Sequence, residues 1–327
     1  MPEIIIANHS TDALNRAIGK LRAGELVAIP TETVYGLAAD ATSGEAVAKI
    51  FATKQRPSFN PLICHVDGVV MAQQYGKFDM IAERLANTFW PGPLTLILPL
   101  VPESGIHDLV TAGLDSIGLR CPRGFSRQVI SAFGRPLAAP SANRSGRISP
   151  TTAQHVAADF AGTDLLILDA GACEAGLEST IVKIDGNRLI LLRPGVITAE
   201  EIADVAGKPV DLPDTDGKVL APGMMKSHYA PDAQVMLDCE TCPDGAAWLG
   251  FGNRAKPANA AEGLNLSETS NLVEAAANLY AYLKQLDESG ADLICVSPIP
   301  REELGIAIND RLQRAAAPRP SKSGEPG

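Results

Sequence analysis

Short apolar runs alternate with helical stripes through residues 1–206, and this alternation constrains the fold more than any other feature of the sequence. Strands separated by amphipathic helices are typical of an α/β fold. Ser43 and Ser149 are expected as helix caps. The predicted strands are residues 3–7, 26–30, 61–66, 94–100, 116–119, 137–140 and 165–169, and the predicted helices are residues 11–23, 44–54, two within 69–89, and 150–160.

A hairpin signal near the end of this region predicts antiparallel pairing. The turn DGN at residues 185–187 separates two apolar runs, residues 179–184 and 188–192, and Asp-Gly in such a place is typical of a tight hairpin. Thr198 and Glu201 have the spacing of a capping box, which opens a short helix. We therefore predict a mixed sheet rather than a wholly parallel one.

The length of 327 residues suggests about two domains, at roughly 100 to 200 residues each. Residues 208–222 are rich in Pro, Gly and Asp and lack periodicity, which is typical of a linker. A smaller β/α pattern follows, with strands at 235–237, 247–251 and 293–297 and helices at 271–288 and 304–316. The predicted organisation is a first domain at 1–208, a linker at 209–231, a second domain at 232–316 and a mobile tail at 317–327.

Composition excludes several classes of protein. No apolar run approaches the ~18 residues of a membrane span, and no basic, apolar signal segment opens the chain, so we expect a cytoplasmic protein without membrane contact. Six scattered cysteines are expected to be reduced. Cys239 and Cys242 have CxxC spacing, but no second pair accompanies them, which favours ordinary thiols over a metal or redox site.

The charge pattern favours a small anionic ligand. The net charge of −10 makes tight non-specific binding to nucleic acid a poor expectation. Residues 116–158 nevertheless contain six arginines and no acidic residue, which is a local anion-attracting window. For Arg127 and Arg135 we favour a solvated surface role. A small phosphorylated ligand fits this distribution better than a polynucleotide.

Familiar catalytic signatures are absent or incomplete. The sequence contains no GxxxxGK[ST], HExxH, GxSxG or EF-hand motif. Residues 250–255 match GxGxx[GA], but Lys256 and Pro257 follow where a dinucleotide fingerprint needs the start of a helix. A glycine turn is the favoured interpretation.

Polar segments follow the predicted strands of the first domain, which is where an open α/β sheet binds its ligand. Lys54 and Arg56 place two cations at a helix end, where they could merely offset the helix dipole by ~0.3 to 1 kcal/mol. Together with Arg193 and the polar groups of residues 141–143, they instead suggest a cradle for a polyphosphate, with Lys as a point charge and Arg as a bidentate clamp.

The chain carries a set of short motifs, in this order: PTETVYGL (30–37), KQR (54–56), NPLICH (60–65), WPGPLT (90–95), PSAN (140–143), ESTI (178–181), LLRPG (191–195) and APGMMKSHYAP (221–231). Together they resemble the YrdC-type threonylcarbamoyl-adenylate synthases in their long, two-domain form. The resemblance implies a YrdC-like twisted mixed sheet with helices and a smaller Rossmann-like β/α second domain. It also implies a linker that folds over the active site.

The resemblance further implies a nucleotidyltransferase that joins L-threonine, bicarbonate and ATP into threonylcarbamoyl-AMP and releases pyrophosphate. Mg²⁺ would arrive on the phosphates of ATP. A separate tRNA threonylcarbamoyl transferase complex would use the product to modify an adenosine beside the anticodon, and whether the synthase itself binds tRNA is left open.

The family's contacts can be assigned to matching positions of this chain. L-threonine binding is assigned to Thr33, His65, Arg120, the Ala139 backbone and Ser179. ATP binding is assigned to Arg56, Asn60, Ser116, Ser141, Ser149, Arg193 and Lys226. The catalytically important pairs are Lys54 with Arg56 and Ser141 with Asn143.

Simpler roles compete with these assignments. His65 could be a core histidine and Tyr35 a packed aromatic, whereas Glu32 and Glu178 could be caps, surface charges or water-mediated Mg²⁺ ligands. Two other functions also stay open, namely an RNA-binding module that uses the arginine window and a carbamoyl transferase that acts on another acceptor.

Overall fold

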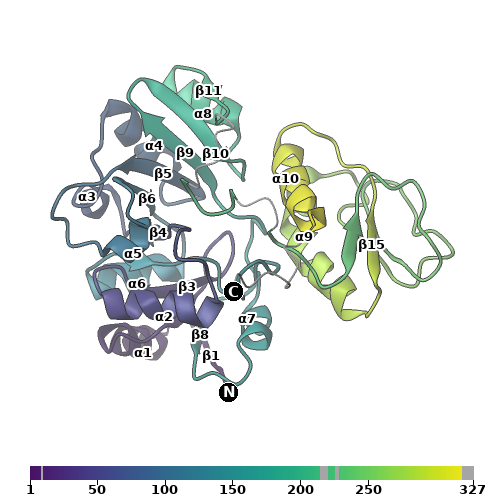
Figure 1. Cartoon of the computed structure of the whole chain (residues 1–327), viewed down its shortest axis with the longest axis horizontal. Helices are drawn as coiled ribbons and strands as arrows, with labels where there is room; N and C mark the ends of the chain where they lie inside the picture. Colours follow the sequence, from purple (N-terminus) through teal and green to yellow (C-terminus); the bar gives the residue numbers. More distant parts are fainter. Residues whose placement is uncertain (9, 214–219, 225–227, 319–327) are drawn as a thin grey trace, which may run out of the picture.

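We analysed a computed structural model of the 327-residue chain, which describes residues 1–8, 10–213, 220–224 and 228–318. These residues form two sheets in two domains that lie side by side (Figure 1). The larger sheet has the strand order β1-β8-β2-β3-β7-β4-β6-β5-β9-β10-β11, and the smaller has the order β12-β15-β13-β14. No helix of the described part is both long and apolar enough to cross a bilayer.

The first domain contains the elements of the larger sheet and the helices around it. Its strands are β1 (Glu3–Ile6), β2 (Val27–Ile29), β3 (Gly36–Asp40), β4 (Ile63–His65), β5 (Leu94–Pro99), β6 (Ser116–Arg120), β7 (Leu137–Ala138), β8 (Leu166–Asp169), β9 (Thr180–Asp185), β10 (Arg188–Arg193) and β11 (Val210–Asp211). Its helices are α1 (Thr11–Arg22), α2 (Gly44–Lys54), α3 (Val69–Ala72), α4 (Met80–Phe89), α5 (Asp108–Thr111), α6 (Phe125–Phe133), α7 (Ala153–Asp159) and α8 (Ala199–Ala206).

Local sequence explains several of these elements. Helix α2 begins where the Ser43 side chain accepts a hydrogen bond from the Ala46 amide, as predicted. The predicted capping box of α8 is present, because Thr198 and Glu201 each bond the other's backbone amide. Strands β9 and β10 pair antiparallel around the predicted turn, whereas β9 pairs parallel with β5. The prediction of a mixed sheet is confirmed.

The helix predicted at 150–160 begins later than expected. Helix α7 starts at Ala153 and is capped by Thr152, so the prediction of Ser149 as its cap is wrong. The backbone of the intervening residues is used elsewhere, because the carbonyls of Pro150 and Thr151 accept hydrogen bonds from other loops. Sequence patterning also missed β3, α5, α6, β11 and β14. Strand β3, expected as the end of a loop, is a run of small residues that is buried on both faces.

The second domain is a parallel sheet flanked by two helices. It consists of β12 (Gln234–Met236), β13 (Ala247–Gly250), β14 (Gly263–Asn265), α9 (Leu272–Glu288), β15 (Leu293–Val296) and α10 (Leu304–Ala316). No helix follows the glycine turn at 250–255 before β14, as predicted. Part of the predicted linker and most of the predicted tail lie outside the described residues.

An apolar cluster joins the two domains beside the polar loops of the first. Val34, Ile148 and Leu177 of the first domain belong to the same buried cluster as Leu279 and Leu283 of α9. The second domain therefore packs directly against the loops at the strand ends of the larger sheet. The candidate site lies among these loops.

Candidate active site

The polar loops predicted from the sequence converge on one cavity beside the interface of the two domains. Topology explains part of this convergence, because His65 and Arg120 are register partners at the ends of the parallel strands β4 and β6. Arg193 ends β10 opposite the start of β9, next to Ser179. The cavity is lined by Thr31, Val34, Gly36, Arg56, Ile63, His65, Arg120, Ala139, Pro140, Ser141, Glu178, Ser179, Arg193, Pro222, Gly223, His228 and Tyr229.

Many of the predicted site residues line this cavity, and most others lie next to it. The lining set contains Arg56, His65, Arg120, Ala139, Ser141, Ser179 and Arg193. Thr33, Lys54, Asn60, Asn143 and Ser149 are bonded to lining residues or to their neighbours in the chain. Ser116 lies in an adjoining cavity that shares Ile63 and Pro222 with the first. Lys226 lies outside the described residues.

The buried Lys54 side chain binds the backbone of the PSAN loop. Its Nζ donates to the carbonyls of Ser141 and Asn143 at 2.5 Å each, and the Ser141 hydroxyl donates to Asn143 Oδ1 at 2.5 Å. Burial, together with the nearby charge of Arg56, lowers the pKa of Lys54 well below its usual value. Lys54 Nζ therefore holds the backbone of the PSAN loop in place, and Asn143 Oδ1 orients the Ser141 hydroxyl within that loop.

Two arginines present guanidinium groups to the cavity from opposite loops. Arg56 is anchored through the carbonyls of Asn60 and Pro61, and burial lowers its pKa to about 10, so that it stays protonated at neutral pH. Arg193 donates to the Ser179 carbonyl and hydroxyl, at 3.1 Å each. Buried guanidinium groups that are held by backbone carbonyls form a preorganised anion site.

Gly195 allows the LLRPG and ESTI segments to approach closely. A Cβ atom at this position would lie 2.5 Å from the Thr180 nitrogen and 2.7 Å from the Glu178 carbonyl oxygen. Only glycine fits such a contact. The glycine that follows Arg193 therefore brings that arginine against Ser179.

The Arg120 side of the cavity contains a buried ion pair and a neutral histidine. Arg120 lies 2.8 Å from Glu32, and both side chains are about 5% exposed. Burial and the charge of Arg120 lower the pKa of His65 to about 3, so the imidazole is neutral at physiological pH. Glu32 is not a surface charge, because its side chain is buried, and it also accepts a hydrogen bond from the Arg123 amide.

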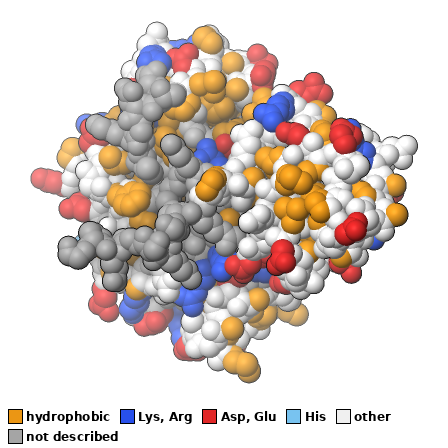
Figure 2. Space-filling view, turned by 45° about the vertical axis from the view of Figure 1, so that its right-hand side comes forward, with side chains coloured by type: hydrophobic (Ala, Val, Ile, Leu, Met, Phe, Trp, Pro, Cys, Tyr) orange, Lys and Arg blue, Asp and Glu red, His pale blue; other side chains and the backbone are white. Residues whose placement is uncertain are grey.

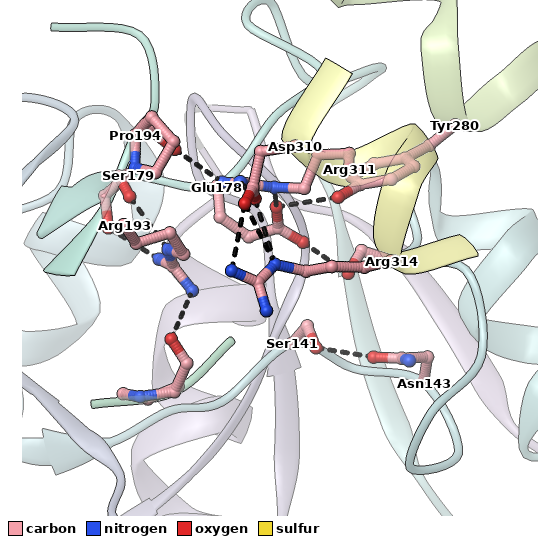
Figure 3. A network of polar contacts seen from close by, with 12 residues as sticks. Ser141, Asn143, Glu178, Ser179, Arg193, Pro194, Tyr280, Asp310, Arg311 and Arg314 are labelled. Carbon is pink, nitrogen blue, oxygen red and sulfur yellow. Dashed lines mark hydrogen bonds and ion pairs between the residues drawn. The ribbon is translucent and has the colours of Figure 1, made fainter. Parts of the chain in front are cut away.

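Glu178 is likewise buried, and its partners come from both domains (Figure 3). It accepts hydrogen bonds from Ser149 at 2.6 Å, from the Tyr280 hydroxyl at 2.7 Å and from Arg311 Nε at 2.8 Å. Sequence analysis missed Tyr280 and Arg311, because neither belongs to a motif. A signal was present for Arg311, since it lies three and four residues from Ile308 and Ala307 on the apolar stripe of α10.

The arginine window does not form one basic surface. Arg120 lies in the cavity, Arg135 pairs with Asp40, and Arg147 pairs with Asp232. Figure 2 shows acidic and basic side chains interspersed on the face it presents. The predicted surface role of Arg127 and Arg135 agrees with their exposure. This dispersal gives no support to an RNA-binding function for the window.

The cysteines and carboxylates of the described residues form no metal cluster. All six cysteines are buried free thiols, and no group of three His, Cys, Asp or Glu side chains with metal-binding geometry occurs in the part of the chain that the structure covers. Tyr35 is a packed aromatic whose hydroxyl donates to the Gly171 carbonyl.

A cavity lined by guanidinium, hydroxyl and imidazole side chains at the strand ends of a mixed sheet is typical of the active site of an α/β enzyme. Comparison with known proteins identifies the family. A model of the Sua5, YciO and YrdC proteins, described as "Telomere recombination", matches residues 19–195, and a model described as "Threonylcarbamoyl-AMP synthase, C-terminal domain" matches residues 197–317. The chain belongs to the threonylcarbamoyl-AMP synthase family in its two-domain form.

Individual relatives match over both domains. The threonylcarbamoyl-AMP synthase of Pyrococcus abyssi is 38% identical, with 93% of this chain and 94% of that protein covered. The Bacillus subtilis protein of the same name is 39% identical, with 93% of each covered. The crystal structure of P. abyssi Sua5 complexed with L-threonine superimposes with a TM-score of 0.88 at 35% identity and covers 97% of each chain. The predicted fold is confirmed.

Proposed function

We propose that this chain joins L-threonine, bicarbonate and ATP into threonylcarbamoyl-AMP and releases pyrophosphate. The observation that carries the proposal is the convergence of three arginines and two serine hydroxyls, Arg56, Arg120, Arg193, Ser141 and Ser179, on one cavity. Membership of the synthase family supports the reaction, and the L-threonine complex of P. abyssi Sua5 supports the amino-acid substrate.

The chemistry suits a site without an enzyme nucleophile. The amine of threonine attacks bicarbonate, and loss of water gives a carbamate. A carboxylate oxygen of the carbamate then attacks the α-phosphorus of ATP, the bond to the bridging oxygen breaks, and pyrophosphate leaves with the electron pair. Because the carbamate itself is the nucleophile, the enzyme has to position two anions and offset their repulsion.

The threonine end of the site is assigned to the Arg120 side of the cavity. Arg120 pairs with the amino-acid carboxylate, while Glu32 holds the guanidinium in place. His65 contributes a neutral imidazole, which can hydrogen-bond the substrate without adding charge. Ser179, the Ala139 backbone and Thr33 complete this end.

The nucleotide end is assigned to Arg56 and Arg193. Their guanidinium groups neutralise the triphosphate, and the Ser141 hydroxyl, fixed by Lys54 and Asn143, points toward the phosphates. Asn60, Ser116, Ser149 and Lys226 are further proposed contacts to ATP.

Mg²⁺ fits this site as a companion of ATP rather than as a resident ion. Glu178, which lines the cavity, already pairs with Arg311, and Glu32, which lies behind the lining residue Arg120, already pairs with that arginine. Magnesium commonly keeps several waters and binds through substrate phosphates, where it supplies charge neutralisation. We further propose that the product passes to a separate tRNA threonylcarbamoyl transferase complex.

Pyrophosphate release tests the proposal. Purified protein with ATP, Mg²⁺ and bicarbonate should release pyrophosphate only after L-threonine is added, and the adenylate should appear in equal amount by mass spectrometry. L-Threonine methyl ester is the matched control, because it lacks the carboxylate assigned to Arg120. Pyrophosphate release that is independent of threonine would contradict the proposal.

A further inference from the structure

Glu178 is the one acidic side chain among the described residues that line the cavity. A carboxylate in a pocket for a triphosphate repels the ligand unless another charge neutralises it, and the repulsion is strong in a buried site. Glu178 is only 6% exposed, so water does little to screen it. A nearby positive charge must therefore neutralise the Glu178 carboxylate while the nucleotide binds.

The neutralising charge comes from the second domain. The Arg311 side chain is fully buried, and besides Glu178 it binds the Pro194 carbonyl at 2.9 Å and Asp310 at 2.6 Å. Its guanidinium also lies 5.3 Å from the ring centre of Tyr229, a cavity residue of the linker. One arginine thus connects the first domain, the linker and α10. Figure 3 shows its contacts with Glu178, Pro194 and Asp310.

Arg193 is the other arginine whose charge acts on Glu178. It is anchored on Ser179, the next residue in the chain, and it lines the same cavity. Although burial raises the pKa of Glu178, the charges of Arg311 and then Arg193 outweigh that effect, and the pKa falls to about 2. Without Arg311, the ionised carboxylate would have Arg193 as its remaining cationic neighbour of comparable effect.

We propose that Arg311 is a positioning residue for the nucleotide, which keeps Glu178 paired with the second domain and leaves Arg193 available to the phosphates. The second domain then takes part in ATP binding without touching ATP. This inference rests on the proposed function, because it needs a triphosphate in the cavity. It differs from a simple docking role, in which Arg311 would only hold the domains together.

Nucleotide affinity distinguishes these roles. The probe is α,β-methylene-ATP with Mg²⁺, titrated by calorimetry into the full-length protein. Arg311→Met should raise the Kd by about tenfold or more, since truncating one partner of a buried charge pair leaves the other unpaired. Asp310 keeps Arg314 as a partner in this variant, so Glu178 is the carboxylate that loses its cation.

Removal of the carboxylate should relieve the defect. Glu178→Gln alone should bind the analogue at least as tightly as the wild type, and the Glu178→Gln, Arg311→Met double variant should come within about threefold of Glu178→Gln, because the two residues act as one coupled pair. If the double variant binds as poorly as Arg311→Met, Arg311 acts through docking and the inference is wrong. If Arg311→Met fails to fold, tenfold weaker binding by Glu178→Gln would refute it instead.

Lys284→Met is the matched control for docking. Lys284 of α9 pairs with Asp159 of the first domain at 2.9 Å, with both side chains mostly buried, and has no contact with Glu178 among the described residues. This variant should bind the analogue within about threefold of the wild type, since it leaves the coupled pair intact. An increase in Kd equal to that of Arg311→Met would overturn the inference. A wild-type protein that binds no analogue would instead refute the proposed function.

Discussion

The two domains bury different kinds of side chain. Among the described residues, the first domain buries many charged groups around its cavity, whereas the second domain buries a single charged side chain, Arg311, beside a mostly apolar core. Burial of a charge is unfavourable unless the charge is paired. Arg311 finds a partner, Glu178, in the other domain. From this contrast we expect the first domain to carry the chemistry and the second domain to support it by holding Glu178 in place.

The largest expected effect comes from removing a charge from the cavity of the first domain. Arg56→Met should lower kcat/KM for pyrophosphate release by about 10³-fold, because a preorganised buried guanidinium stabilises transferring phosphates far more than a solvated one does. Initial rates of pyrophosphate release at saturating threonine and varied ATP would measure this change in kcat/KM. Arg254→Met is the control, since Arg254 is a partly exposed arginine of the second domain paired with Glu240, and its loss should leave the rate unchanged.

A core substitution in the second domain should change stability and spare the chemistry. Leu283 of α9 is fully buried, and Leu283→Ala should lower the free energy of unfolding by about 2 to 5 kcal/mol. Denaturant titration measures that loss. At temperatures where the variant is folded, kcat should stay close to the wild-type value; a loss of kcat in folded protein would break the division of labour between the domains.

Sequence reasoning succeeded where function depends on local order along the chain. Strand-end positions such as His65 and Arg193 could be expected in one site, because an open α/β sheet gathers its polar loops at the strand ends, whereas Arg120 was assigned only through the family resemblance. The hairpin and the capping box were likewise set by adjacent residues. The structure also explains the KQR and PSAN pair, since Lys54 binds the backbone of the PSAN loop.

The rest depended on contacts between distant residues. Arg311 and Glu178 are far apart in the chain, and the helical pattern of α10 gives no indication of its partner. The sequence predicted Ser149 as a helix cap, but its hydroxyl donates a hydrogen bond to Glu178 instead. Strand β3 has too few large apolar residues for its periodicity to be recognised, and its pairing with β2 and β7 decides its conformation.

A smaller effect per residue should appear in the pH dependence of the free energy of unfolding. It should come from two buried histidines at the cavity. Burial lowers the pKa of both His65 and His228 to about 3, whereas in the unfolded chain each titrates near 6.5. The unfolded state therefore binds more protons below pH 6.5, so stability falls as the pH drops. Between pH 7 and pH 5 the loss should be about 2 kcal/mol per histidine.

Denaturant titrations at both pH values check this expectation. His65→Asn should remove about half of the loss attributed to the two histidines, because asparagine does not titrate. An unchanged pH dependence in this variant would mean that His65 is protonated in the folded protein, and the neutral imidazole assigned to the threonine end would be wrong.

The smallest effects should come from helix caps, and they should be alike in the two domains. Thr198 caps α8 in the first domain, and Asn271 caps α9 in the second, each by accepting hydrogen bonds from backbone amides. Thr198→Ala and Asn271→Ala should each lower the free energy of unfolding by about 1 kcal/mol. Neither cap contacts the cavity, so pyrophosphate release should stay at the wild-type rate. Slower catalysis by Asn271→Ala, with an unchanged rate for Thr198→Ala, would contradict this expectation. Helix α9 would then affect the site by contacts other than the hydrogen bond from Tyr280 to Glu178.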